Sequence, residues 1–455
     1  MTNTRYSPEE DIAAIATALA PGALGIVRTS GKNSIELLSK VFSRPEALKK
    51  AEGNTIVYGW ITDQGSRVDE VLVSVFKAPK SFTGEDMCEI SCHGGVSVVT
   101  AVYETLLKNG FRPAEKGEFT FRSYINGKSD LTKAEAVREI IDSKTDVSRS
   151  HAAGRLSGSL FAEIDSIKTL VTDTLAAIEV DIEYPEDEET IADSFDPADL
   201  ENARDRLAQL ASSWKSEKLY QDGAKIVLAG KTNAGKSSLF NALLKEDRSI
   251  VSDIEGTTRD WIESWVSFDG IPARLFDTAG LRETDDVIEA KGVELTKDLA
   301  AEADLVLYLI DSTQGLSEED KAFISKNGSI PVIVVFNKCD LALIEDDIEG
   351  KTVHISAKKG TGVGELTNLV KQTILGDSTA KSETAGLGSQ RQKESVAEAL
   401  DRINHALEIA AEGSYGLDAV VQDLEDCLDS LGEVTGEVTP DDVLGSIFSH
   451  FCVGK

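Results

Sequence analysis

The chain lacks long apolar segments, and this excludes a transmembrane helix. None of its apolar runs approaches the roughly 20 residues that a membrane-spanning helix needs. The first residues also lack a basic segment followed by an apolar core, so the sequence predicts no secretory signal peptide. Cysteine is scarce, with five residues at spacings that form no disulfide framework. These absences together predict a protein of a reducing, cytoplasmic compartment.

Basic residues are also in short supply. Lysine and arginine number 47 against 79 aspartates and glutamates, a formal net charge of −32. Such a charge disfavours non-specific binding to nucleic acid, so a nucleic-acid partner would need a local basic patch or a second protein. Hydrophobic residues make up 41% of the 455 residues, enough for the cores of two or three domains.

A glycine-rich segment stands between a predicted strand and a predicted helix. Residues 230–237 read Gly-Lys-Thr-Asn-Ala-Gly-Lys-Ser, after the apolar run at 226–229 and before an apolar segment at 238–244. Strand, glycine-rich loop and helix form the context of a phosphate-binding P-loop. The loop amides and the helix N-terminus would bind phosphate oxygens. Lys236 would bridge the β- and γ-phosphates, and the Ser237 hydroxyl would bind Mg²⁺.

Three further motifs each follow a predicted strand: Asp277-Thr278-Ala279-Gly280, Asn337-Lys338-Cys339-Asp340 and Ser356-Ala357-Lys358. In the first, Asp277 is expected in the second sphere of Mg²⁺ and Gly280 is expected to sense the γ-phosphate. The Asp340 carboxylate can accept both the N1–H and the N2–H of guanine, which adenine cannot supply. The third motif would close over the base. The set resembles the translation-factor-like P-loop GTPases, with a Ras-like doubly wound sheet.

The position after Gly280 departs from Ras-type GTPases, which carry a water-positioning glutamine there. Leu281 stands in its place, so hydrolysis needs another route. Oxygens of Asn233 and of residues 252–260 could hold a monovalent cation, with Thr258 as the expected Mg²⁺ ligand of the switch. Glu289 could orient water, although spacing alone leaves Glu283, Asp285 and Asp286 open. The nucleotide-binding candidates are Asn233, Ala234, Gly235, Lys236, Ser237, Ser238, Ser252, Asp253, Ile254, Glu255, Gly256, Thr257, Thr258, Asp277, Thr278, Ala279, Gly280, Asn337, Lys338, Asp340, Ser356, Ala357 and Lys358.

The rest of the chain predicts two further parts. Residues up to about 125 read as mixed α/β, including a strand at 87–93 with Cys88, Ile90 and Cys92 on its apolar face. Apolar positions at helical spacing follow over 131–180, and again beyond a Ser/Thr/Gly-rich linker at 376–390. Neither helical half can bury a full core alone, so the α/β unit is expected to be inserted into a helical domain. The predicted domains are 1–125, 126–221, 222–378 and 379–455.

The C-terminal residues Phe451-Cys452-Val453-Gly454-Lys455 complete a second resemblance. Together with Ser81-Phe82-Thr83-Gly84-Glu85-Asp86, His93-Gly94-Gly95 and Gly256-Thr257-Thr258-Arg259-Asp260, they make the whole chain similar to the MnmE (TrmE) family of tRNA uridine-modifying GTPases. Two positions differ from the family pattern. Ala114-Glu115-Lys116-Gly117 replaces the Arg-Pro-Gly that is frequent before Glu118, and Ser252 stands where threonine is common but keeps the hydroxyl.

This resemblance implies a K⁺-stimulated GTPase and an N-terminal domain that dimerises. That domain would bind a formyl- or methylene-tetrahydrofolate through Arg28, Glu89, Lys128 and Lys455. Asn233, Ser252, Ile254 and Thr257 would hold K⁺, Glu289 would act in hydrolysis, and Cys452 would be catalytic or lie near the chemistry. The homodimer would join an FAD-containing partner, MnmG (GidA), in a heterotetramer or larger complex, and modify C5 of the wobble uridine of certain tRNAs.

Alternative interpretations remain at this stage. Cys452 could be a buried structural cysteine of a docked tail. A ribosome-assembly GTPase would need a basic RNA-binding module, which the acidic C-terminal part does not provide. A folate-dependent one-carbon transferase with a merely regulatory GTPase domain is the third reading, and substitutions in residues 230–237 would separate it from the first.

Overall fold

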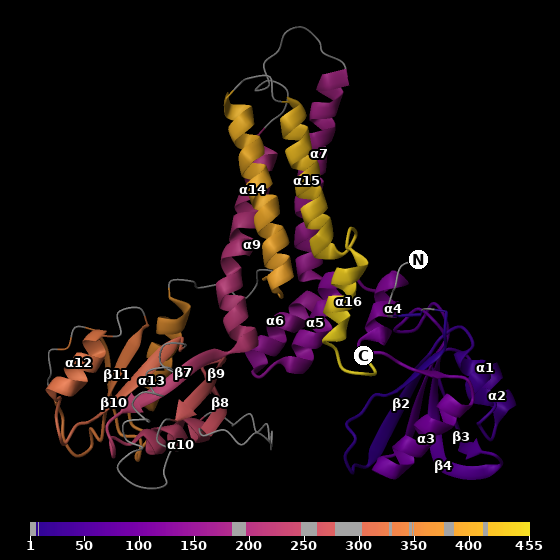
Figure 1. Cartoon of the computed structure of the whole chain (residues 1–455), viewed down its shortest axis with the longest axis horizontal. Helices are drawn as coiled ribbons and strands as arrows, with labels where there is room; N and C mark the ends of the chain where they lie inside the picture. Colours follow the sequence, from indigo (N-terminus) through magenta and orange to yellow (C-terminus); the bar gives the residue numbers. More distant parts are fainter. Residues whose placement is uncertain are drawn as a thin grey trace. The chain divides into compact units, whose positions relative to one another are not determined.

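The computed structural model describes residues 6–7, 9–183, 197–246, 262–277, 303–326, 330–344, 348, 350–376, 386–412 and 417–455 (Figure 1). The chain forms two compact units. The first contains Met1–Arg138, Phe161–Arg204 and Glu394–Lys455, and the second contains Glu139–Leu160 and Asp205–Lys393. No helix within the described ranges is long and apolar enough to cross a membrane.

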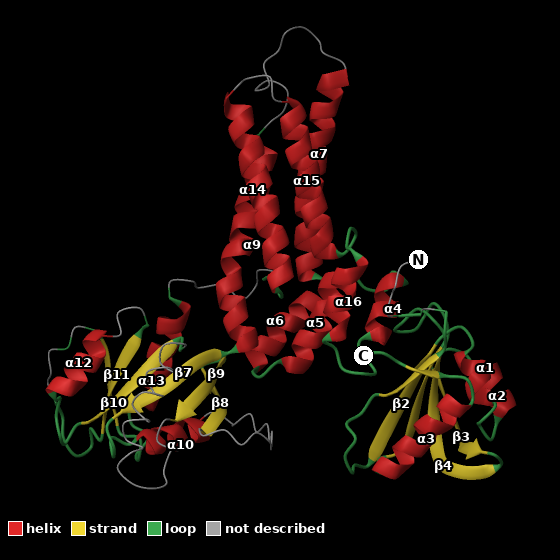
Figure 2. Ribbon diagram, viewed as in Figure 1, coloured by secondary structure: helices red, strands yellow, loops and turns green. Residues whose placement is uncertain are grey.

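The N-terminal part of the first unit is a six-stranded sheet in the order β3-β4-β5-β2-β1-β6 (Figure 2). Neighbouring strands are antiparallel except for β1 and β6. Helices α1, α2 and α3 accompany the sheet and share its core. The elements are β1 (Ile12–Ile15), β2 (Leu24–Ser30), α1 (Ser34–Ser39), α2 (Pro45–Lys50), β3 (Thr55–Asp63), β4 (Ser66–Phe76), β5 (Met87–His93), α3 (Val96–Lys108) and β6 (Arg112–Pro113).

Side-chain alternation divides this sheet into a core face and an open face. Cys88, Ile90 and Cys92 of β5 are buried in the core with residues of α3, which confirms the predicted apolar face. Strand β3 had no sequence prediction. Its alternate residues Ile56 and Tyr58 are exposed, so the apolar pattern of a buried strand is present on one face only.

The helical region contains several helices. They are α4 (Glu118–Ile125), α5 (Leu131–Asp142), α6 (Asp146–Leu156), α7 (Ser159–Glu183), α9 (Ala198–Asp222), α14 (Gln390–Glu412), α15 (Leu417–Thr435) and α16 (Asp441–Ser449). Three of them, α5 to α7, lie over residues 131–180, where the sequence predicted one helical region. The break before α6 is marked by Thr145, whose hydroxyl accepts the Ser148 amide and caps the new helix. Residues 161–204 and 394–455 belong to one compact unit although the α/β domain separates them in sequence. The predicted insertion into a helical domain is therefore confirmed.

The inserted domain is a doubly wound sheet in the order β12-β11-β10-β7-β9-β8. All neighbours are parallel except β8 and β9, and β8 is the strand that the sequence analysis missed. Its fully apolar strands, such as β10 with six buried residues, are typical of a sheet covered on both faces. The elements are β7 (Ala224–Gly230), α10 (Lys236–Glu246), β8 (Ile262–Phe268), β9 (Ile271–Asp277), β10 (Leu305–Asp311), α12 (Glu318–Lys326), β11 (Val332–Asn337), β12 (Lys351–Ile355) and α13 (Val363–Leu375).

A buried arginine connects three segments of the N-terminal part. The Arg122 side chain is fully buried in α4, and its Nη1 donates to Glu85 Oε2 at 2.9 Å. Its Nη2 donates to Glu118 Oε1 at 2.9 Å and to the carbonyls of Ser7 and Glu10. A buried cation with these partners holds the β4–β5 loop, α4 and the first residues together.

Arg122→Met is expected to destabilise the first unit by about 3 kcal/mol, because it leaves Glu85 and Glu118 buried with one cation fewer. Thermal unfolding of the full chain would measure the loss. Arg44→Met is the matched control, since Arg44 is exposed and donates only to the Tyr58 carbonyl. Equal melting temperatures for the two variants would contradict the prediction.

Candidate functional site

The P-loop between β7 and α10 has the geometry of an anion site. Asn233 and Gly235 both have positive φ, 63° and 98°. These left-handed residues turn the amides of the loop toward one side, where an anion can accept them. Asn233 and Ser237 are exposed, whereas Ala234 is buried beneath them. The loop thus faces outward with its polar atoms and is anchored by its apolar ones.

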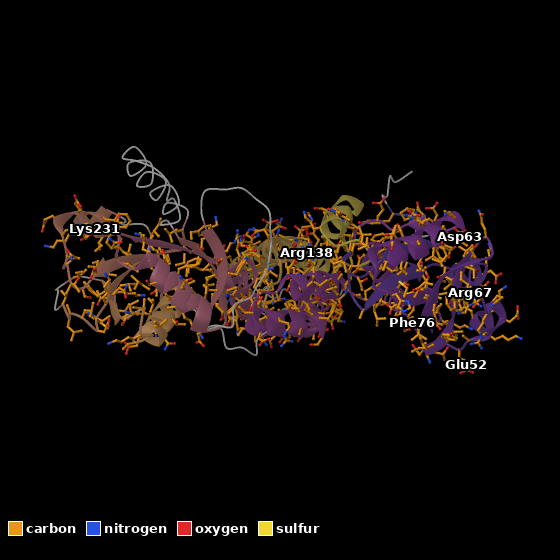
Figure 3. All side chains as sticks on the ribbon, turned by 90° about the horizontal axis from the view of Figure 1, so that it is seen from below. Glu52, Asp63, Arg67, Phe76, Arg138 and Lys231 are labelled. Atoms are coloured by element: carbon orange, nitrogen blue, oxygen red, sulfur yellow. The ribbon has the colours of Figure 1, made fainter. Side chains whose placement is uncertain are left out.

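Lys236 is held across this loop. Its ammonium donates to the Gly230 carbonyl at 2.6 Å and to the Lys231 carbonyl at 3.0 Å. Lys231, whose carbonyl accepts one of these two hydrogen bonds, is labelled in Figure 3. Both acceptors belong to the loop that would receive the phosphates. The positive charge is therefore already positioned beside the anion site.

Asn337 connects three of the predicted nucleotide motifs. Its buried side chain donates from Nδ2 to the Ala234 carbonyl of the P-loop at 2.9 Å. Its Oδ1 accepts the amides of Lys338 at 2.9 Å and Ala357 at 3.0 Å. Sequence reasoning placed Asn337 among the nucleotide contacts. Its side chain contacts protein atoms and positions the groups that would bind the nucleotide.

Asp340 and its neighbours form the predicted base-binding end of the site. Hydrogen bonding by the Ser356 hydroxyl lowers the pKa of Asp340, and Lys359 Nζ lies 3.3 Å from Oδ2. The carboxylate is therefore ionised at neutral pH, as acceptance of two guanine N–H groups requires. Lys358 lies in the same loop after β12.

Lys338 has a partner that the sequence analysis missed. Its ammonium donates to Asp311 Oδ2, at the carboxyl end of β10. Asp311 Oδ1 also accepts the amide and hydroxyl of Thr313. An aspartate at the end of an apolar strand was the available signal, since that edge of a parallel sheet carries functional groups.

The two Mg²⁺-related positions of the described chain lie on neighbouring elements. Asp277 ends β9 and pairs with Leu228 of β7, and Ser237 lies in the first turn of α10. A hydroxyl is an oxygen donor of the kind that Mg²⁺ prefers, so Ser237 fits that ion. The other candidates of this region lie outside the described residues: Ser252, Asp253, Ile254, Glu255, Gly256, Thr257, Thr258, Thr278, Ala279, Gly280 and Glu289.

A second constellation lies on the open face of the N-terminal sheet, around Arg28. Its Nε lies 3.0 Å from Glu89 Oε1 on the adjacent strand β5, in register with it. Its guanidinium lies 5.4 Å from the Phe82 ring centroid and 5.2 Å from that of Phe119. Burial lowers the pKa of Arg28 while Glu89 opposes that shift, and the guanidinium stays charged.

The C-terminal tail joins this constellation. The Gly454 carbonyl accepts from Arg28 Nη1 at 3.0 Å. The Cys452 and Lys455 carbonyls accept the amides of Gly117 and Phe119 at the start of α4, and Val453 bridges to Lys116. The tail therefore lies against the sheet domain and brings its cysteine to the same surface as Arg28 and Glu89.

Cys452 differs from the other thiols in exposure. Burial raises the pKa of Cys88 to about 12, of Cys92 to about 11 and of Cys427 to about 12. Thiols with such pKa values carry almost no thiolate at neutral pH. Cys452 is exposed, so the alternative of a buried structural cysteine is wrong for this residue.

Lys128 is the remaining candidate of the second constellation. It is exposed and follows the turn at Asn126, whose side chain donates to the Thr83 carbonyl. A Cβ built on Gly84 would lie 3.3 Å from Lys128 Cγ, which places the lysine over the β4–β5 loop. Structure thus brings Arg28, Glu89 and Lys455 together around the tail, with Lys128 on the loop that carries Phe82.

The doubly wound sheet, the P-loop and the guanine-specific motifs define a P-loop GTPase, an enzyme that hydrolyses GTP. The family described as MnmE helical domain matches residues 131–452, and that described as GTP-binding protein TrmE N-terminus matches residues 11–128. The chain belongs to the MnmE family.

Relatives that match nearly the whole chain agree with this assignment. The chain is 52% identical over 470 residues to the tRNA modification GTPase MnmE of Treponema denticola, with 99% of each chain covered. It is 39% identical to the protein of the same name in Acetivibrio thermocellus, covering 98% of this chain and 99% of the relative. Era of Aquifex aeolicus is 27% identical over 39% of this chain and 66% of its own, with a TM-score of 0.26, too low to carry an argument.

Gly235→Ala is expected to weaken GTP binding by roughly tenfold or more. A Cβ there would lie 2.1 Å from Asn337 Nδ2, and a non-glycine residue at this φ costs about 1–2 kcal/mol. Titration of a fluorescent GTP analogue would measure the loss. Gly364→Ala in α13 is the control, because a Cβ at that position meets nothing within 4 Å. If Gly235→Ala bound GTP with wild-type affinity, the requirement for glycine at this position of the P-loop would be ruled out.

Asp340→Asn is expected to lower GTP affinity on the order of 10²-fold and to favour xanthosine triphosphate. The amide presents a donor toward the guanine N–H groups, whereas it can donate to the 2-oxo group of xanthine. Competition between the two nucleotides would measure the exchange. Asp269→Asn is the control, because Asp269 lies in the β8–β9 turn and forms an ion pair with Lys371 of α13. An unchanged preference for GTP would remove Asp340 from the base-binding site.

Proposed function

We propose that this GTPase modifies C5 of the wobble uridine of certain tRNAs, using a tetrahydrofolate one-carbon unit and an FAD-containing partner of the MnmG (GidA) type. The observation that carries the proposal is that one chain combines a guanine-nucleotide site with an exposed cysteine in a tail that Arg28 holds at the Gly454 carbonyl. The tRNA modification GTPases to which the chain is similar match 98–99% of it and are consistent with the proposal. The five free cysteines of this chain suit a cytoplasmic protein.

The folate would bind at the second constellation. Glu89 and Arg28 offer a carboxylate and a guanidinium side by side, and Phe82 offers an aromatic surface beside them. Lys128 and Lys455 would neutralise the carboxylates of the donor. Bound folate would supply the one-carbon unit, and Cys452 would lie close to the reacting atoms because the tail is fixed by Arg28.

Potassium would replace an arginine finger in hydrolysis. Asn233, with its positive φ and exposed side chain, is the described member of the proposed ligand set, together with Ser252, Ile254 and Thr257. Ser237 and Thr258 would hold Mg²⁺, and Glu289 would orient the attacking water. A cation at this place would offset the charge that develops between the phosphates.

A homodimer is the proposed assembly, and the open face of the N-terminal sheet supports it. Ile56, Tyr58 and Leu72 are 66%, 48% and 48% exposed on neighbouring positions of β3 and β4. Adjacent exposed apolar side chains of this kind mark protein–protein contacts. We also propose that the segments 1–125, 126–221, 222–378 and 379–455 act as the functional parts of the chain.

GTP turnover is expected to be roughly tenfold or more faster in KCl than in NaCl at equal ionic strength, because Na⁺ is too small for a site built for K⁺. The full chain with GTP and Mg²⁺ suffices for the measurement. Asn233→Ala should lose the stimulation and keep the rate in NaCl. Asn241→Ala, an exposed asparagine of α10, is the matched control. Equal wild-type rates in the two salts would overturn the K⁺ assignment.

A further inference from the structure

The β4–β5 loop presents two lysines and an aromatic ring beside the C-terminal tail. Phe76, labelled in Figure 3, ends β4, and Lys77 follows it. The amide of Lys80 donates to the Lys77 carbonyl at 2.8 Å, which closes a turn. Phe82 then places its ring, 38% exposed, 5.4 Å from the Arg28 guanidinium. Arg28 in turn holds the tail, so this loop and Cys452 belong to one surface.

Lys116 adds a third cation on the other side of the tail. It is exposed, and its backbone forms an antiparallel β-bridge with Val453, the residue after Cys452. The next residue, Gly117, donates its amide to the Cys452 carbonyl. We call Lys77, Lys80, Lys116 and Phe82 the lysine surface. Its loop part contacts the tail through Phe82 and Arg28, and Lys116 contacts the tail at Val453.

The charges of the lysine surface are uncompensated. Among the described residues, no carboxylate lies within 4 Å of the ammonium groups of Lys77, Lys80 or Lys116, whereas Lys49 and Lys108 of the same domain are both paired. The nearby Asp86 uses Oδ1 to accept the Ala78 amide. In a chain with a net charge of −32, lysines without an ion-pair partner near one segment are available to an anionic partner.

We propose that the lysine surface docks the RNA substrate, an inference that rests on the proposed function. Phosphates of a single-stranded loop would lie on Lys80, Lys116 and Lys77, and an unstacked base would lie on the Phe82 ring. Aromatic rings bind unpaired bases by stacking, and lysines follow the backbone. A target base extruded from such a loop would then lie beside the tail and its thiol.

The chemistry of the surface favours RNA over other anionic partners. An acidic peptide would use the lysines and leave the exposed ring without a role. The glutamate chain of a folate would also use lysines, but Lys128 and Lys455 are already available for it beside Arg28. Among macromolecular partners, RNA uses both the cations and the aromatic ring, and its dissociation constant should depend strongly on salt.

The test compares variants of the full chain for binding of a labelled RNA hairpin with a uridine-containing loop, by fluorescence anisotropy at about 50 to 200 mM KCl. Lys80→Ala with Lys116→Ala should raise Kd roughly fivefold or more and lower the slope of log Kd against log salt by about two. Phe82→Leu should weaken binding roughly tenfold, and Phe82→Tyr should restore it. The control pair is Lys40→Ala with Lys50→Ala, exposed lysines of the α1–α2 region.

Each outcome separates this inference from the proposed function. Equal losses in the two lysine pairs would overturn the surface, because net charge alone would then explain them. Unchanged RNA binding with a weaker affinity for formyl-tetrahydrofolate would assign the lysines to the folate and overturn it too. Absence of RNA binding by the wild-type chain would also overturn it. GTP turnover in KCl and folate affinity, both expected to be unchanged in Lys80→Ala with Lys116→Ala, test the proposed function independently.

Discussion

Parallel strand pairing fixes where the P-loop and the Asn337 motif lie. Strand β7 pairs with β10 so that Gly230 lies opposite Leu309, and β11 pairs with β10 so that Asn337 lies opposite Asp311. Because the strands run the same way, their carboxyl ends meet at one edge. The P-loop, Asp311 and the Asn337 motif therefore lie close together at this edge of the sheet. A slip of one residue would turn every buried apolar side chain of these strands to the opposite face, so the hydrophobic core enforces the register of the site.

Strand pairing brings the loops of the site near one another, and side-chain hydrogen bonds then fix their positions. Asn337 reaches the P-loop at the Ala234 carbonyl and the base-binding loop at the Ala357 amide. One amide group has a donor and an acceptor, so it can fix both loops where a carboxylate or an ammonium could fix one. The close approach requires glycine at 235, since a Cβ there would occupy the position of Asn337 Nδ2. The phosphate end and the base end of the site are thus coupled through a single buried residue.

Local patterns predicted most of this architecture, and pairwise contacts account for what they did not. The buried strands of the inserted domain are short apolar runs followed by polar motifs, so their places could be read from the sequence. Strand β8 was missed because Glu263, Ser264 and Ser267 interrupt its apolar pattern, and it pairs along one side only. The link between Lys338 and Asp311, 27 residues apart, has no local signal. The Arg28 contact with Gly454 spans 426 residues and depends on the tertiary fold alone.

The second constellation shows how an acidic chain can still form a cationic surface. Arg122 and Arg28 are buried and use their charges internally, on Glu85, Glu118 and Glu89. In each of these ion pairs the charge of one acid near the tail offsets the charge of one base. The acids of the β4–β5 loop are consequently engaged, Glu85 by Arg122 and Ser30, while its lysines face solvent. Local field depends on which charges remain unpaired near a point and not on the total, because screening limits their reach to about 10 Å. A net charge of −32 is therefore compatible with a surface around Cys452 that attracts phosphate.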